Sequence, residues 1–358
     1  MEGMVSMETL SFYKGKTVLV TGHTGFKGSW LSKVLLNAGA NVIGYSLDLL
    51  TDPSLFELAD IKKEMVSITG DIRDQEHLGK VFDQFRPEVV IHMAAQPIVR
   101  ESYIHPVYTY ETNVMGTVNV MECVRNSNSV KSVVNVTTDK VYENKEWEWG
   151  YRENEPLNGY DPYSNSKSCS ELVTSSYVNS FFRDKEVAVS TARAGNVIGG
   201  GDFSKDRIIP DCIRAVKENR EIIVRNPFSI RPYQHVLEPL GVYLELARRQ
   251  WYDKTFASAY NVGPNEDCCI TTGALVDMFC QKWGDDAKWS TEKSEGPHEA
   301  GLLKLDCSKV KSKLEWSPIW NISMAIDKVT EWTKVYFMNG NVSLCMDNQI
   351  REYFQNRG

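Results

Sequence analysis

One turn near the start of the chain constrains the fold more than any other feature. An apolar, β-prone run at 16–21 leads into a glycine-rich turn at 22–28, and apolar residues then recur at helical spacing up to Gly39. A second β-prone run follows at 41–46. Strand, glycine turn, helix and strand within about 30 residues indicate a β-α-β unit that binds a dinucleotide.

The alternation of strands and helices continues along the first half of the chain. Strands are predicted at 65–68, 88–93, 131–138 and 186–193, and helices at 74–85, 106–126 and 163–182. Such alternation is typical of a parallel sheet with right-handed crossovers. The predicted fold class is therefore α/β, a Rossmann-like doubly wound parallel sheet with a smaller C-terminal substrate-binding domain.

The glycine turn predicts the phosphate side of a cofactor site. Its glycines permit a tight turn, close approach of the backbone to a pyrophosphate, and close packing of helix on strand. The expected cofactor residues here are Gly22, Thr24, Gly25, Phe26, Lys27 and Gly28. Asp48 lies past the second strand, where a carboxylate binds the adenine ribose, and no Arg follows to attract a 2′-phosphate. We therefore expect NAD rather than NADP.

Two further strand ends point to the same crevice. Asp71 and Ile72 follow the third strand, and Ala94, Ala95 and Gln96 follow the fourth. Ligands bind at the carboxyl ends of strands in this architecture, and small residues let the backbone approach a cofactor. Tight packing would also explain the two alanines, and the two interpretations are compatible.

A group of polar residues suggests the chemistry. Tyr163 and Lys167 are one helical turn apart, and a lysine beside a phenol lowers the pKa of that phenol. Thr138, Asp139 and Lys140 end the preceding strand. A packing tyrosine is the common alternative, so the catalytic interpretation depends on the cofactor site. Simple alcohol oxidation needs neither Asp139 nor Lys140, which suggests a second proton transfer.

Together these residues resemble the extended short-chain dehydrogenase/reductase family. The matching motifs are Thr21-Gly-x-x-Gly-Phe-x-Gly28, Asp71, Ala94-Ala95, Asn113, Thr138 and Tyr163-x-x-x-Lys167, which span nearly the whole chain. The resemblance implies that the tyrosine is the catalytic acid or base. It also implies that the lysine holds the nicotinamide ribose and that the threonine orients the substrate hydroxyl.

Other passages resemble the nucleotide-sugar dehydratase branch of that family. Related enzymes for dTDP-sugars carry Asp-Glu where this chain carries Asp139-Lys140, which favours the CDP-sugar branch. The resemblance implies a CDP-sugar substrate bound by Asn113, Asn196, Arg207, Arg231 and His298. The implied roles are oxidation at C4 by Tyr163 with NAD, removal of the C5 proton by Lys140, and protonation of the leaving 6-hydroxyl by Asp139.

Three alternatives stay open. A nucleotide-sugar 4-epimerase needs only Tyr163, Lys167 and a hydroxyl, and leaves Asp139 and Lys140 without a role. A dehydratase could act on another nucleotide sugar, since the fold alone does not specify the base. A non-enzymatic NAD-sensing protein predicts a broken Tyr–Lys pair, whereas this pair is intact.

The regularity of the pattern weakens after Arg193, and prolines become frequent. The predicted division is an NAD-binding Rossmann domain at 14–195 with a return segment at about 232–262, a nucleotide-sugar-binding domain at 196–231 and 263–340, and a C-terminal tail at 341–358. The helices at 106–126 and 163–182 carry apolar residues on more than one face. We therefore expect a homodimer or homotetramer.

The bulk properties exclude several classes of partner. A net charge of −7 argues against nucleic acid or an anionic membrane surface. The eight cysteines lack Cys-x-x-Cys spacing, and the six histidines lack metal-ligand spacing. No apolar run approaches the ~20 residues of a membrane span. We expect a cytoplasmic protein without a bound metal.

Overall fold

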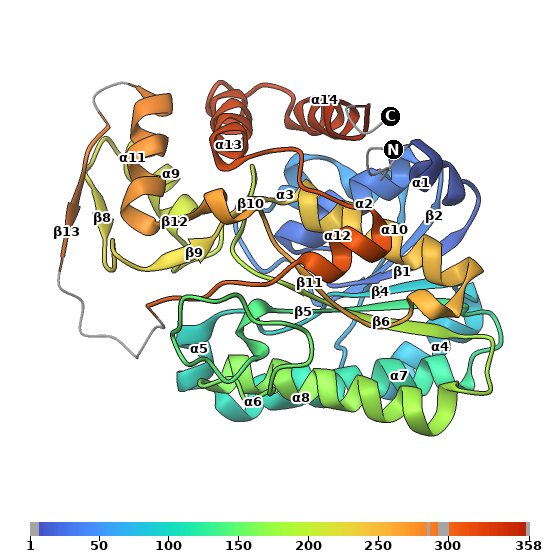
Figure 1. Ribbon diagram of the computed structural model, residues 1–358. Helices are drawn as coiled ribbons and strands as arrows, with labels where there is room; N and C mark the ends of the chain where they lie inside the picture. Colours follow the sequence, from blue (N-terminus) through green and yellow to red (C-terminus); the bar gives the residue numbers. More distant parts are fainter. Residues whose placement is uncertain (1–6, 285–286, 293–300, 356–358) are drawn as a thin grey trace.

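A computed structural model describes residues 7–284, 287–292 and 301–355 (Figure 1). Seven parallel strands form its sheet in the order β11-β6-β5-β4-β1-β2-β3. Their bounds are β1 Thr17–Thr21, β2 Asn41–Ser46, β3 Val66–Thr69, β4 Val89–His92, β5 Ser132–Thr137, β6 Ala188–Ala194 and β11 Ala259–Val262. This order, with its reversal beside β1, confirms the predicted Rossmann-like α/β fold.

Helices cover both faces of the sheet. Figure 1 shows α4, α7 and α8 on one face and α2, α10 and α12 on the other. The helices packed around the sheet are α1 Met7–Phe12, α2 Phe26–Asn37, α3 Leu55–Leu58, α4 Gln75–Phe85, α5 Val99–Ile104, α6 Pro106–Tyr110, α7 Gly116–Asn126, α8 Pro162–Tyr177, α10 Leu237–Tyr252 and α12 Ser308–Leu314. The central strands β1, β4, β5 and β6 are buried between these layers, whereas the edge strand β3 is partly exposed.

The two long predicted helices each contain an irregular turn. The helix predicted at 106–126 is α6 and α7 joined by the π-helical turn η2, Glu111–Met115. The helix predicted at 163–182 is α8 followed by a second π-helical turn, η4, Val178–Phe182. Single 3₁₀ turns connect other elements: η1 Ile61–Glu64, η3 Asp139–Val141, η5 Lys254–Phe256 and η6 Glu266–Cys268.

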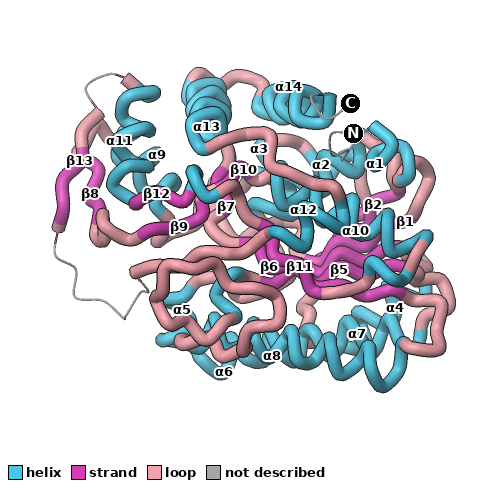
Figure 2. Tube along the Cα trace, viewed as in Figure 1, coloured by secondary structure: helices cyan, strands magenta, loops and turns pink. Residues whose placement is uncertain are grey.

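A group of elements at one end of the sheet forms most of the part of the chain predicted to bind substrate (Figure 2). They are α9 Ile208–Lys217, α11 Thr272–Trp283, α13 Ile322–Phe337, β7 Val197–Ile198, β8 Ile222–Val224, β9 Ile230–Pro232, β12 Cys269–Thr271 and β13 Trp289–Thr291. β10 Gln234–His235 joins them from the segment predicted to return to the cofactor domain. The strands pair two by two, as β10-β7, β12-β9 and β13-β8. The exact division into two domains stays a prediction.

The segment predicted as a C-terminal tail is instead mostly a packed helix, α14, Val342–Gln355. Its apolar side chains Met346, Ile350 and Phe354 are buried, and the helix packs on α2 and α13. The hydroxyl of Tyr353 donates to Glu238 Oε2 of α10 at 2.8 Å. Apolar residues at helical spacing therefore tie the end of the chain to the cofactor half.

Candidate active site

The predicted catalytic residues meet where β5 ends and α8 begins. After β5 the chain forms the turn η3, Asp139–Val141, at the edge of the sheet where ligands bind in this architecture. Asp161 caps α8 and accepts a backbone hydrogen bond of 2.9 Å in the first helical turn. Tyr163 therefore lies at the start of the helix, and Lys167 lies one turn later on the same face.

The electrostatics of this pair differ from the prediction. The Thr138 side chain hydrogen-bonds the Tyr163 hydroxyl, and Lys167 Nζ donates to Val136 O at 3.1 Å. Burial nevertheless raises the pKa of Tyr163 to about 12, against the lowering effects of Thr138 and Arg207. Burial also lowers the pKa of Lys167 to about 8. The pKa of Tyr163 thus moves opposite to the predicted lowering, because desolvation of the phenolate outweighs the hydrogen bond from Thr138 and the charge of Arg207.

Asp139 is fixed from both sides. It is 1% exposed; its Oδ1 accepts from Thr138 Oγ1 at 2.9 Å and its Oδ2 accepts from Asn196 Nδ2 at 3.1 Å. A Cβ added at Gly195 would come within 1.9 Å of that carboxylate. Asn196 was predicted to bind the substrate diphosphate, but here its amide orients Asp139. The adjacent Lys140 is half-buried.

A cluster of opposite charges joins the glycine turn to the turn η3. Burial lowers the pKa of Lys27 to about 7, with further lowering by Arg207 and Lys167 and opposition from Asp139 and Asp202. These five charges come from the glycine turn, α8, η3 and the loop before α9. Three predicted groups of residues, for cofactor, catalysis and substrate, therefore form one site.

The glycine turn fits a pyrophosphate. Gly22 has φ +77°, and a Cβ there would lie 2.9 Å from the backbone of Ala94, which is half-buried beside Ala95. A Cβ at Gly28 would lie 2.1 Å from Gly22 O. A Cβ at Gly25 would have only Gly22 O nearby, at 3.5 Å, among the described residues. Gly25 is the N-cap of α2 and supplies no side-chain cap, so the first turn of the helix offers backbone N–H groups to an anion.

The other predicted cofactor residues lie around the ends of β2 and β3. Thr24 Oγ1 lies 2.8 Å from Ser46 Oγ and holds the glycine turn against β2. Asp48 is exposed just past that strand, as a ribose contact requires. Asp71 forms an ion pair of 2.7 Å with Arg73, which lowers the pKa of Asp71. A cofactor contact by Asp71 therefore competes with this ion pair.

Two of the predicted contacts are buried joints. Asn113 is 1% exposed; its Oδ1 accepts from Gln96 N at 2.8 Å, and its Nδ2 donates to Gln96 O at 3.1 Å and to Ser166 Oγ at 2.9 Å. The predicted substrate contact of Asn113 is thus corrected: its amide ties the end of β4 to α8. Ile72 is buried, and its carbonyl accepts from Asn119 Nδ2 at 3.0 Å.

The predicted substrate arginines lie on separate elements. Arg207 begins α9 and forms an ion pair of 3.7 Å with Asp202. Arg231 lies on β9, is 8% exposed, and donates to Ile230 O at 2.9 Å and Gly301 O at 3.3 Å. Its charge faces the protein interior, as a buried phosphate contact requires. His298 lies outside the described residues.

The sequence analysis missed a buried ion pair between α8 and β6. Arg193 and Glu171 form a buried ion pair of 2.8 Å, and Glu171 also accepts from Thr137 at 2.5 Å. Glu171 follows Lys167 by four residues, and its charge opposes the lowering of the pKa of that lysine by burial. The four-residue spacing from Lys167 to Glu171 could have indicated this contact, because it places Glu171 on the same helix face as Tyr163 and Lys167. Asp202 could not be found this way, because only the fold brings it to Lys27.

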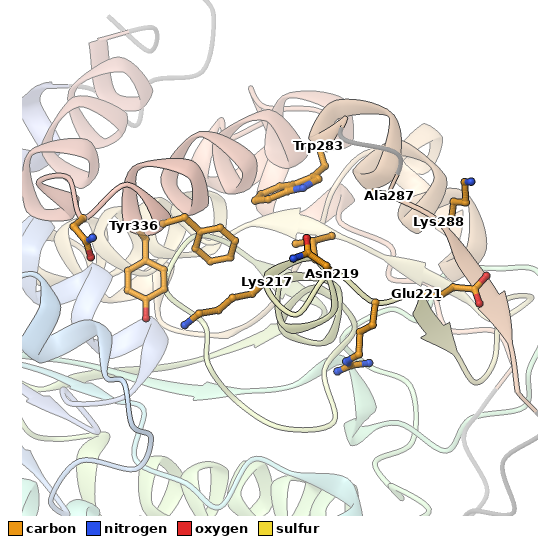
Figure 3. A pocket seen from close by; sticks show the side chains of 11 residues that line it. Lys217, Asn219, Glu221, Trp283, Ala287, Lys288 and Tyr336 are labelled. Atoms are coloured by element: carbon orange, nitrogen blue, oxygen red, sulfur yellow. The ribbon is translucent and has the colours of Figure 1, made fainter.

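A cavity of about 870 Å³ lies elsewhere, between α9, α11 and α13. Figure 3 shows Lys217, Trp283, Lys288 and Tyr336 around it. None of its lining residues belongs to the predicted site. Within the described residues, no helix is long and apolar enough to cross a bilayer. The same residues contain no group of three or more His, Cys, Asp or Glu arranged to hold a metal.

Comparison with known proteins shows which proteins this chain resembles. The chain is 50% identical over 349 residues to CDP-glucose 4,6-dehydratase of Salmonella typhimurium, covering 96% of this chain and 97% of that protein. It is 25% identical to human dTDP-D-glucose 4,6-dehydratase, covering 90% and 91% of the two chains. Both alignments extend over the cofactor and the substrate portions of the site.

Solved structures share the fold. UDP-glucose 4-epimerase of Thermotoga maritima superposes with a TM-score of 0.78 at 20% identity, covering 90% of this chain and 99% of that one. The dTDP-glucose 4,6-dehydratase of Bacillus anthracis, solved with NAD, gives 0.75 at 21% identity, covering 93% and 100%. The model of the GDP-mannose 4,6 dehydratase family matches residues 19–329. The chain therefore belongs to that family of nucleotide-sugar dehydratases and their relatives.

Proposed function

We propose that this protein converts CDP-D-glucose to CDP-4-keto-6-deoxy-D-glucose with tightly bound NAD. The observation that carries the proposal is the Asp139-Lys140 turn beside Tyr163, in a chain that is 50% identical to a CDP-glucose 4,6-dehydratase. NAD, when bound, accepts a hydride from C4 of the sugar and returns it to C6. Gly22, Gly25 and Asp48 would hold it.

The first step depends on Tyr163. Its hydroxyl takes the proton of the sugar 4-hydroxyl while C4 loses its hydride, so a ketone forms at C4. Thr138, which hydrogen-bonds the same phenol, orients the sugar hydroxyl. Lys167 lies one turn away, where its charge stabilises the phenolate. The pKa of about 12 already includes the hydrogen bond from Thr138, so the phenol needs further positive charge to act as a base, which a bound NAD⁺ would add.

The second step is a loss of water. Lys140, in its neutral form, removes the C5 proton that the ketone has acidified. The C6–O bond breaks, a C5–C6 double bond forms, and the 6-hydroxyl leaves as water with a proton from Asp139 in its acid form. Asp139 accepts two hydrogen bonds, so this proton must occupy a remaining lone pair. Hydride addition at C6 and return of the proton from Lys140 to C5 give the product, and the proton that Tyr163 took must replace the one that Asp139 gave up.

One assay tests the proposed substrate and separates the alternatives. The purified protein is incubated with CDP-, dTDP-, UDP- and GDP-glucose, and products are weighed by mass spectrometry. We expect the CDP-sugar to lose one water without accumulation of NADH in the medium. A 4-epimerase would change no mass. Turnover of another nucleotide sugar in preference to CDP-glucose would contradict the proposed base.

Replacing Lys140 tests the proposed elimination base. We expect Lys140→Met to form enzyme-bound NADH in a single turnover, while elimination slows by ~10²–10⁴ as for loss of a general base. Lys145→Met is a matched control, since Lys145 is an exposed lysine of the following loop. Exchange of the C5 proton for solvent deuterium at the wild-type rate would exclude Lys140 as the base.

We also propose a cytoplasmic homodimer or homotetramer. Large apolar side chains are exposed on the α5–α8 face: Ile104 at 66%, Val107 at 69%, Met115 at 51% and Leu172 at 56%. An apolar face of this kind favours burial against a second copy. Sedimentation at micromolar concentration measures the assembly. A monomer there would contradict the proposal, and Leu172→Glu should weaken a dimer.

A further inference from the structure

Arg100 lies where the two halves of the site meet. It belongs to α5, which follows the end of β4 and packs on the catalytic helix α8. Its Nε lies 3.8 Å from Oδ1 of Asp206, in the loop before α9. Asp206 directly precedes Arg207, which acts electrostatically on Tyr163 and Lys27. The Arg100–Asp206 contact therefore joins α5 of the cofactor half to the loop that carries Arg207.

Asp206 has a second and better partner. Arg225 Nη1, beyond β8, donates to Asp206 Oδ1 at 2.7 Å. The contact with Arg100 is longer than a hydrogen bond. Arg100 Nε is buried and has no hydrogen-bond partner among the described residues. A buried donor without a partner costs free energy, so a new acceptor for the Nε–H of Arg100 would stabilise the protein.

The charges of this group favour an anion. The linked group of Arg100, Arg214, Arg225, Asp206 and Asp211 has three positive and two negative charges, so one positive charge is left over. If Arg100 turned toward an incoming anion, Asp206 would keep its hydrogen bond with Arg225 and no carboxylate would be left unpaired. The exchange would therefore cost little on the protein side. A guanidinium also presents a planar fork that suits phosphate oxygens.

We infer that Arg100 is an additional specificity-determining contact for the diphosphate of the substrate, supplied by the cofactor half. The inference rests on the proposed nucleotide-sugar function. Without substrate, Asp206 holds Arg100 beside the loop that carries Arg207. With substrate, Arg100 donates to the diphosphate from the side opposite Arg231, and both halves grip the same anion. Selection for a nucleoside diphosphate over a nucleoside follows from that contact.

Binding measurements on the NAD-loaded enzyme test this inference. CDP and cytidine are titrated by calorimetry into the wild type, Arg100→Gln, Arg100→Lys and Asp206→Asn. Arg152→Gln is the control, since Arg152 is an exposed arginine paired with Glu155. We expect Arg100→Gln to bind CDP about 10- to 100-fold more weakly, the range for a hydrogen bond to a charged group. Cytidine binding should not change.

The remaining variants separate substrate binding from a purely structural ion pair. Arg100→Lys should lose part of the affinity, because an ammonium lacks the planar fork. Asp206→Asn should bind CDP as tightly as the wild type or more tightly, since the resting competitor is weakened. KM for CDP-glucose should rise in Arg100→Gln more than kcat falls. Unchanged melting temperatures would show that the variants fold.

Three results would overturn the inference alone. One is wild-type CDP affinity in Arg100→Gln. The second is an equal loss of CDP affinity in Arg100→Gln and Asp206→Asn, and the third is an equal loss of affinity for CDP and cytidine. Either of the last two would mark the contact as structural. If the wild type neither bound CDP nor turned over CDP-glucose, the proposed substrate would fail, and this inference would fail with it.

Discussion

The two halves of the site are built in different ways. The cofactor half is made of backbone: a turn at Gly22 with φ +77°, an open N-terminus at Gly25, and a contact at Gly28 that leaves no room for a Cβ. The substrate half is made of charged side chains held in pairs, such as Arg207 with Asp202 and Arg225 with Asp206. The cofactor half therefore offers backbone shape, and the substrate half offers charged side chains.

This difference sets how each half should respond to change. A methyl group added to the cofactor half strikes backbone that cannot move. A charge removed from the substrate half leaves its partner free to bind something else. The turn η3, Asp139–Val141, combines both properties. Its buried Asp139 is held by a hydrogen bond from Asn196, whereas the adjacent Lys140 is half-buried. The predictions below test this contrast from its largest expected effect to its smallest.

Tyr163→Phe should abolish the first step and leave the fold intact. Losing the base should slow hydride transfer by at least ~10²–10⁴, so no NADH should form on the enzyme in a single turnover. Stopped-flow absorbance measures this. Tyr160→Phe is the control, since Tyr160 is 77% exposed. If NADH formed at the wild-type rate, Tyr163 would not be the base.

Gly28→Ala should destabilise the cofactor half by about 3 kcal/mol or more. The new Cβ would lie 2.1 Å from Gly22 O and 2.6 Å from His23 Cα, and overpacking against backbone is costly. Gly25→Ala is the matched variant: its Cβ would have ordinary contacts, so stability should hold while NAD binding falls. Denaturant unfolding and NAD titration distinguish the two. Equal stability of both variants would contradict a rigid backbone cradle.

Arg231→Ala should weaken the CDP-sugar more than NAD. Loss of a charge-assisted contact in a buried site should cost about 2–3 kcal/mol. Arg220→Ala, at an exposed arginine paired with Glu218, should change neither affinity. Calorimetry with each ligand gives the two affinities. Equal weakening of both ligands would show that Arg231 supports the fold through Ile230 O and Gly301 O.

Acid should weaken the cofactor half through its buried histidines. Burial lowers the pKa of His23 to about 4 and that of His92 to about 3, from an ordinary 6.5. Both are neutral in the fold, so their stabilising contribution is complete above pH 6.5. It is lost as pH falls from 6.5 toward 4 and 3, by up to about 1.4 kcal/mol per pH unit each.

The free energy of unfolding, measured in urea between pH 7.5 and 5, checks the acid effect. His92→Asn should flatten the dependence of this free energy on pH, because the unfolded chain then takes up one proton fewer in acid. His105→Gln is the control, since His105 is an exposed histidine between α5 and α6, and it should leave the slope unchanged. A slope in His92→Asn equal to that of the wild type would show that His92 does not carry the effect.

Much of the fold followed from local pattern. β2 has the predicted bounds, Asn41–Ser46, and Ala259–Val262 returns to the sheet as β11. Helix α14 was missed because residues 341–358 are polar enough to be taken for a tail. Its apolar face becomes buried only when the fold brings α2 and α13 beside it. For the site, Tyr163 and Lys167 lie together as predicted, but the pKa of Tyr163 moves in the opposite direction.

The sequence by itself determined the Rossmann-like sheet, the glycine turn and the Tyr–Lys pair. Each depends on spacing within one or two elements, and spacing is written in the chain. Only the tertiary structure decided that Asn196 orients Asp139, that Asn113 is a buried joint, and that Arg100 meets Asp206. Those contacts join residues 17 to 106 positions apart, and burial and charge at such contacts arise only when the chain is folded.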